Sequence, residues 1–359
     1  MTRRHLFASA AATIAAPMVN LGRCQLFGAT GATYSTRVVD LVSRSLVIDM
    51  LGLLTMDWPK LARWHSDPSS FRAEDFDQVR RARIDVLHPA VELGAEDAFE
   101  GTCKWLSSWE GFVQQNPTRF RVVRTCRDLV SAKDSWRVGI LFGMQNSEHF
   151  RSAADVPFFY ARGQRISQLT YNASNRLGSG CGEPGGDGLS AFGAEIVQAM
   201  NSCGMAIDVS HANERTTLEA IEASSKPLLV THSNCRALVR HPRCKSDAVI
   251  RAMARKGGVM GITGVGAFLS SRRKASIEDV LNHFDHVARL VGIEHLGIGS
   301  DAGVDEGRPL PHLEVQGLRQ SRRVFDLTAG FVRRGYSNAA IEAILGRNFQ
   351  SALNKIIGA

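Results

Sequence analysis

Several signatures that assign a function directly are missing from this sequence of 359 residues. Although the net charge is +8, no long Lys/Arg run forms a basic patch, so nucleic-acid binding is disfavoured. No segment reaches about 18 uninterrupted apolar residues, which excludes a stable membrane-spanning helix. The seven cysteines form no CxxC pair, which excludes a zinc ribbon. Disulfides between them could form only in an oxidising compartment. No GxGxxG motif opens a helix after the first strand, which removes the main reason to expect a dinucleotide-binding fold.

The first 30 residues differ in composition from the rest of the chain. The pair Arg3-Arg4 precedes a weakly hydrophobic, alanine-rich run from Ala8 to Val19. This order is typical of a twin-arginine export signal, and the alternative is a disordered start on a cytosolic protein. We therefore expect an export signal over residues 1–30, a single domain over residues 31–359, and a periplasmic or exported location.

Short apolar runs bounded by Gly, Pro or polar residues recur along the chain and predict eight strands. These are Leu46–Asp49, Arg83–His88, Val138–Gly143, Ile166–Thr170, Met205–Val209, Leu228–Val230, Val259–Ile262 and Leu296–Gly299. Helical patterns lie between many of them, at Ala95–Gln115, Ala191–Cys203, Glu214–Ala223, Asp247–Lys256 and Ile277–Val291. Alternating strands and helices imply a parallel sheet, and eight such units predict an α/β fold of the (β/α)8 TIM-barrel type. A doubly wound open sheet is the alternative.

The residues at the end of each predicted strand, or just after it, are rich in metal-binding and proton-transfer groups. They are Asp49, His88, Gln145, Tyr171, His211, His232, Thr263 and Asp301. Barrel enzymes place their chemistry at the carboxyl ends of the strands, although a single strand-end histidine more often serves packing. His211 and His232 end consecutive strands and Asp301 ends the last. Two imidazoles and one carboxylate converging there would suit zinc.

Several long motifs resemble one known family. They are Gly204–His211, Thr231–Leu238 with His241–Arg243, Gly257–Ile262, Gly297–Asp301, Arg333–Ser337 and Ile344–Asn348. On these motifs the chain, from about Val47 to Ile356, resembles the membrane dipeptidase (renal dipeptidase) family of zinc metallopeptidases. The resemblance implies a barrel like that of metal-dependent amidohydrolases. It also implies hydrolysis of small peptide-like substrates by two zinc ions that share a bridging carboxylate and a hydroxide.

The resemblance also implies roles for individual residues. His211 and His232 would bind one ion, while Asp301 would bind the other and transfer protons. Arg243 would bind the free carboxylate of the dipeptide. Tyr171 stands where the family has a histidine that stabilises the oxyanion, and a phenol can still donate that hydrogen bond.

The other ligand positions depart from the family. Leu51 and Leu53 replace the His-x-Asp pair after the first strand, and Gln145 replaces the bridging glutamate. Substitute ligands are conceivable at Asp49, Asp208, Glu148, His88 and His149, although Asp208 is more simply a partner that orients His211.

Three functions follow from these substitutions. The first is hydrolysis of a dipeptide or related small amide by water activated on zinc, with one ion, or with two ions if substitute ligands complete the second site. The second is a metal-free, catalytically silent homologue that binds small peptide-like ligands through Arg243. The third is a hydrolase for another substrate, such as a lactone.

Two further patterns concern packing and surface. Trp105, Trp109 and Phe112 have helical spacing, which predicts core packing or a contact in a homodimer. The doublets Arg322-Arg323 and Arg333-Arg334 predict solvated helix faces.

Overall fold

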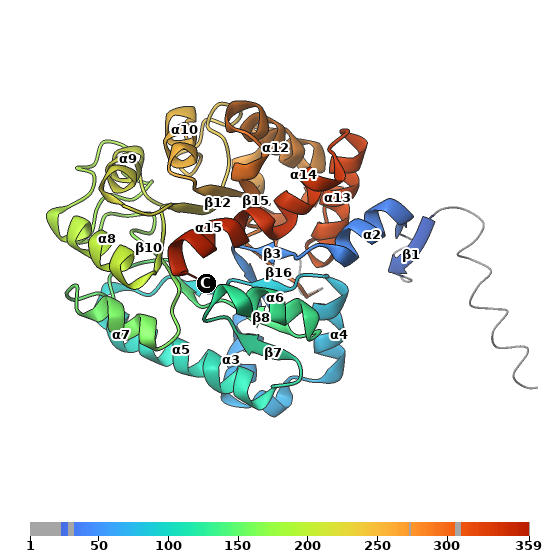
Figure 1. Ribbon diagram of the computed structural model, residues 1–359, viewed down its shortest axis with the longest axis horizontal. Coiled ribbons are helices and arrows are strands. Elements are labelled where there is room, and N and C mark those ends of the chain that lie inside the picture. The colour runs from blue at the N-terminus through green and yellow to red at the C-terminus, as the bar shows by residue number, and fades with distance from the viewer. Residues whose placement is uncertain (1–22, 28–31, 273, 306–309, 359) are drawn as a thin grey trace, which may run out of the picture.

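The structure, a computed structural model, describes residues 23–27, 32–272, 274–305 and 310–358 (Figure 1). The expected export signal therefore lies almost entirely outside the described residues. Eight strand segments form the main part of the central sheet: β3 (Ile48–Asp49), β5 (Val86–Leu87), β8 (Val138–Ile140) continued by β9 (Gly143–Met144), β10 (Ile166–Gln168), β11 (Ala206–Asp208), β12 (Leu229–Ser233), β13 (Val259–Ile262) and β15 (Leu296–Ile298). Each lies within or overlaps one of the eight predicted runs.

The hydrogen-bonded order of these strands makes a closed ring. All neighbours are parallel, and the last strand, β15, pairs with the first, β3, through Ile298 and Asp49. The segment 138–144 closes the remaining gap, because β8 pairs with β5 while β9 pairs with β10. The predicted (β/α)8 barrel is thereby confirmed, and the open doubly wound sheet is wrong.

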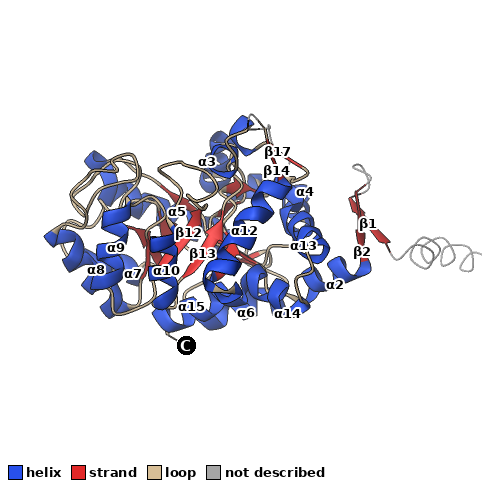
Figure 2. Ribbon diagram, turned by 90° about the horizontal axis from the view of Figure 1, so that it is seen from above, coloured by secondary structure: helices blue, strands red, loops and turns tan. Residues whose placement is uncertain are grey.

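Helices surround the barrel (Figures 1 and 2). They are α2 (Thr36–Arg44), α3 (Trp58–Ser66), α4 (Ala73–Arg81), α5 (Ala98–Gln115), α6 (Cys126–Asp134), α7 (Asp155–Ala161), α8 (Ala191–Cys203), α9 (Glu214–Ala223), α10 (Asp247–Arg255), α11 (Gly266–Leu269), α12 (Ile277–Val291), α13 (Arg323–Arg333), α14 (Asn338–Glu342) and α15 (Asn348–Ile357). Side-chain caps explain several starts: Ser190 and Asn213 accept bonds from the first turns of α8 and α9, and Ser276 with Asp279 forms a capping box on α12. None of the helices in the described part of the chain has the length and apolar character needed to cross a bilayer.

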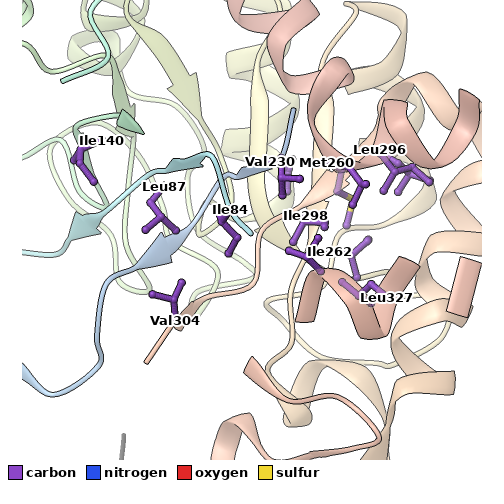
Figure 3. Packing of buried hydrophobic residues seen from close by; sticks show 14 of the residues in the cluster. Ile84, Leu87, Ile140, Val230, Met260, Ile262, Leu296, Ile298, Val304 and Leu327 are labelled. Atoms are coloured by element: carbon purple, nitrogen blue, oxygen red, sulfur yellow. The ribbon is translucent and has the colours of Figure 1, made fainter. Parts of the chain in front are cut away.

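Apolar side chains of the strands and helices fill the core. Val230, Met260, Ile262 and Ile298 lie together on three neighbouring strands, with Leu327 of α13 beside them (Figure 3). Trp109 and Phe112 of α5 are fully buried, and Trp105 is partly buried against the same core, which confirms the predicted core packing of this helix.

The two ends of the barrel differ. Phe349 of α15 packs so closely on Gly297, in β15, that a Cβ at that glycine would lie 2.1 Å from its ring. Helix α15 therefore covers the end where the strands begin, opposite to β14 (Ala275–Ser276) and β17 (Val315–Gln316) (Figure 2). At the carboxyl ends, β4 (Gly52–Leu53) pairs with β16 (Ala302–Gly303), which extends the first and last strands. The remaining short strands are β1 (Arg23–Phe27), β2 (Ala32–Ser35), β6 (Ala90–Val91) and β7 (Phe120–Val122).

Candidate active site

The two predicted histidine ligands meet at the carboxyl ends of neighbouring strands. His232 lies in β12 and His211 lies three residues beyond β11. Both side chains are buried, and their Nε2 atoms are 2.9 Å apart. The alignment of consecutive parallel strands thus brings together two residues that are 21 positions apart in sequence.

Hydrogen bonds assign the proton of each imidazole. His211 Nδ1 lies 2.8 Å from Asn172 Oδ1, an amide oxygen that can only accept. His232 Nδ1 lies 2.8 Å from Thr231 Oγ1, whose own proton goes to Asp208 Oδ2 at 2.5 Å. Both Nδ1 atoms are therefore the donors, and in the neutral rings both Nε2 atoms carry lone pairs. This network corrects one expectation, because Asp208 orients His232 through Thr231 and makes no hydrogen bond to the His211 ring.

Two lone pairs that face each other repel unless a cation lies between them. A proton is disfavoured there, because burial and the nearby Arg243 guanidinium hold the pKa of both histidines well below the ordinary value. A neutral imidazole whose Nε2 lone pair carries no proton is the form in which histidine binds zinc. Two nitrogens on a tetrahedral zinc lie roughly 3.3 Å apart, so the rings need to separate by only about 0.4 Å. The pair fits two nitrogen ligands of one ion.

A complete metal site is not assembled from the described residues. No group of three or more His, Cys, Asp or Glu side chains in that part of the chain is arranged to hold a metal ion. Asp301, the third predicted ligand, follows β15 in a left-handed conformation with φ of 59°. Its backbone N–H donates to Leu51 O at 2.8 Å, which places it beside the first lost ligand position.

The remaining predicted residues lie around the histidine pair. The Tyr171 ring stacks on His211, with ring centroids 4.2 Å apart. Burial, and next the negative charge of Asp301, raise the pKa of the Tyr171 phenol above its ordinary value. Burial likewise raises the pKa of Asp301, against the lowering effect of Arg243. Arg243 is buried and donates to Ser210 O at 2.5 Å and to His232 O at 3.0 Å.

The substituted ligand positions are packed as core or bonded to neighbouring amides. Leu51 and Leu53 are buried at the start of the β4 extension. Gln145 donates from Nε2 to Ala90 O at 3.2 Å and accepts from Gln168 Nε2 at 3.4 Å. Neither leucine offers a ligand atom, and the neutral Gln145 amide is a poor bridge between two cations.

Asp49, one of the possible substitute ligands, is committed to an ion pair. Arg323 Nε and Nη2 lie 2.9 and 2.8 Å from Asp49 Oδ2, and both side chains are only 1% exposed. Asp49 Oδ1 accepts from the backbone N–H of Ser300 at 2.9 Å. The expected solvated face at Arg322-Arg323 is thus wrong for Arg323, which turns inward from the first residue of α13 to reach the first barrel strand.

Two other possible substitute metal ligands, His149 and Glu148, are engaged in side-chain hydrogen bonds. His149 Nε2 lies 3.1 Å from Gln164 Oε1, and Glu148 accepts from Asn146 Nδ2 at 3.1 Å. His88 differs, because Nδ1 lies 2.6 Å from Met50 O while Nε2 is buried without a hydrogen-bond partner in the described structure. That nitrogen packs against Gly143, where a Cβ would lie 1.9 Å away. The close backbone leaves little room for an ion at His88.

A cavity of about 1090 Å³ is lined in part by Thr55, Met56, Gly303 and Gln320. Neither histidine of the pair lines it, so this cavity does not by itself locate the chemistry. Two lining residues, Thr55 and Gly303, lie two positions beyond Leu53 and Asp301, respectively.

Comparison with known proteins assigns the family. The model of the membrane dipeptidase family (peptidase family M19) matches residues 37–357. An uncharacterized protein in the pqqA 5' region of Klebsiella pneumoniae is 30% identical over 66% of this chain and 89% of its own length. The dipeptidase tcpJ of Claviceps purpurea is 29% identical over 66% of this chain, and the match spans 56% of that longer protein.

A solved structure is similar to this chain over most of its length. An amidohydrolase from Pseudomonas aeruginosa is 26% identical and superposes with a TM-score of 0.79 over 90% of this chain and 99% of its own. The resemblance inferred from the motifs is therefore confirmed. The chain belongs to the membrane dipeptidase family, and with it to the hydrolases.

Proposed function

We propose that this hydrolase cleaves the peptide bond of dipeptides, or of a closely related small amide, with one zinc ion bound by His211, His232 and Asp301. The observation that carries the proposal is the pair of Nε2 atoms 2.9 Å apart, whose lone pairs face each other because both Nδ1 atoms are donors. Zinc bound there would supply a water molecule acidic enough to attack an amide near neutral pH.

The protein's own groups supply the remaining chemistry. The raised pKa of Tyr171 keeps the phenol protonated at neutral pH, so its hydroxyl can donate to the oxygen that becomes negative in the transition state. The Asp301 carboxylate would accept a proton from the attacking water and deliver it to the departing amine.

Arg243 is proposed to select substrates with a free carboxylate. Two of its five N–H hydrogens are used on the carbonyls of Ser210 and His232, which leaves hydrogens for a ligand and fixes the guanidinium plane. A planar cation held in this way suits recognition of a carboxylate.

Zinc-dependent turnover of a panel of simple dipeptides tests this function. The zinc-reconstituted chain should cleave them, and His232→Ala should reduce kcat/KM at least about 100-fold, because a two-histidine site does not survive loss of one ligand. His286→Ala is the matched control, since this histidine bonds Asp247 at the start of α10 and makes no contact with the site. Activity that persists in His232→Ala, or after complete metal removal, would contradict the proposal. Dipeptide binding without turnover in the zinc-loaded chain would instead support the silent homologue.

We also propose that the protein is exported through the twin-arginine route. The proposal rests on Arg3-Arg4 and the alanine-rich run after them, which lie outside the described residues. Replacement of both arginines by lysine should trap the precursor in the cytoplasm. In the exported protein, the mature N-terminus should lie between about Pro17 and Tyr34. Unchanged localisation of the double variant would contradict this route.

A further inference from the structure

Two buried cations from one short segment hold the turn that carries His211. Arg243 donates to Ser210 O at 2.5 Å, and Lys245 Nζ donates to Val209 O at 2.6 Å and to Ala212 O at 2.8 Å. The carbonyl of His211 itself accepts from the backbone N–H of Cys181 at 2.7 Å. Every backbone carbonyl from residue 209 to residue 212 therefore has a donor, and three of these four carbonyls receive it from residues 243 and 245.

Lys245 is an unusual residue for this place. Its side chain is buried, and its third acceptor is Thr217 Oγ1 at 3.4 Å, whose own proton goes to Asn213 O at 2.7 Å. No carboxylate accepts a hydrogen bond from Nζ in the described structure. Burial, and next the charge of Arg243, lower the pKa of Lys245 to about 7.

A buried ammonium with only neutral acceptors costs free energy that an apolar side chain of similar length, such as methionine, would not. The carbonyls of Val209 and Ala212 bracket His211, and both are in the buried part of the structure. Without the ammonium, Ala212 O would lose its main donor, and Val209 O would retain only the amide of Ala212 at 3.2 Å. The turn would then be free to shift and carry the His211 ring with it.

We propose that Lys245 is a positioning residue, which holds the 209–212 turn so that His211 Nε2 faces His232 Nε2. It acts through the backbone and touches neither ring. The inference rests on the proposed function only in that the histidine pair binds zinc.

The test compares Lys245→Met with Lys226→Met. Lys226 is a matched control, because its Nζ also donates to a backbone carbonyl, Ile356 O at 2.6 Å, on the far side of the barrel from the histidines. Zinc affinity, measured by competition with a chromophoric chelator, should fall about 10- to 100-fold in Lys245→Met, as expected for loss of a residue that orients a ligand. The visible spectrum of the cobalt-substituted protein should change as well. Lys226→Met should match the parent in both.

The outcomes separate this inference from the proposed function. A parent chain that binds no zinc contradicts the proposed function. In that case the role of Lys245 is tested by the nuclear magnetic resonance signals of the His211 ring in the metal-free chain. These signals should shift in Lys245→Met but not in Lys226→Met. Unchanged zinc affinity, cobalt spectrum and ring signals in a folded Lys245→Met would overturn the inference. If that variant does not fold, Lys245→Gln replaces it with the same expected direction, and parental values would again overturn the inference.

Discussion

Replacing Arg323 by methionine is expected to lower the free energy of unfolding by about 3–5 kcal/mol. Arg323 and Asp49 are both 1% exposed, so the substitution leaves a carboxylate buried without its cation. The carbonyls of Gly303 and Gln320, which accept from Arg323 Nη1 at 2.8 and 2.6 Å, lose a donor as well. Urea-induced unfolding of the parent and the variant measures the loss.

Two further variants give this prediction its controls. Arg333→Met removes an ion pair with Glu278 in which both side chains are at least half exposed, so its effect should stay below about 1 kcal/mol. The double change Asp49→Asn with Arg323→Met removes both charges, so it should be more stable than Arg323→Met alone. A loss below about 1 kcal/mol in Arg323→Met would show that water or another group compensates Asp49.

The combined substitution Leu51→His, Leu53→Asp and Gln145→Glu is expected to create a second zinc site. It restores the ligand types of the resembled family at the ends of the first and third strands, beside Asp301, whose N–H bonds Leu51 O at 2.8 Å. In the proposed site with one ion, neither a bridging charge nor a second cation acts on the bound water, so that water should be less acidic and turnover slower than with two ions. The variant should therefore cleave simple dipeptides faster.

Stability provides a second readout for this variant. Polar groups at two buried leucine positions destabilise the metal-free fold, whereas zinc stabilises it by about 2.7 kcal/mol when present at 100 times its Kd. The melting temperature of the variant should thus rise with added zinc by more than that of the parent. A folded variant that gains neither metal nor activity would mean that this end of the barrel is reshaped for a reaction other than dipeptide hydrolysis.

The element pattern of the fold could be predicted because it depends on local sequence. Helices α8, α9 and α12 occupy the residues that the periodicity predicts, with Gly204 and Gly292 directly after α8 and α12. The break of the third strand into β8 and β9 could not be predicted. It reflects which neighbour each half pairs with, and that depends on strands distant in the sequence.

Some contacts of the candidate site could also be predicted from the sequence, and others could not. His211 and His232 could be paired from sequence because consecutive parallel strands end side by side. The Asp49–Arg323 pair could not, since its partners are 274 positions apart and an arginine doublet at a helix start looks like a solvated surface. The contacts of Lys245 could not be predicted for a related reason, because its acceptors are backbone carbonyls, which no side-chain motif reveals.

The number of zinc ions per folded chain tests the central claim most directly. Metal analysis after zinc reconstitution and removal of loosely bound ions should give about one equivalent, because two histidines with Asp301 can satisfy one ion but not two. That equivalent should be lost in His211→Ala. Two tightly held ions would contradict the account by requiring substitute ligands. No bound zinc would contradict it by leaving the facing histidine pair without a metal.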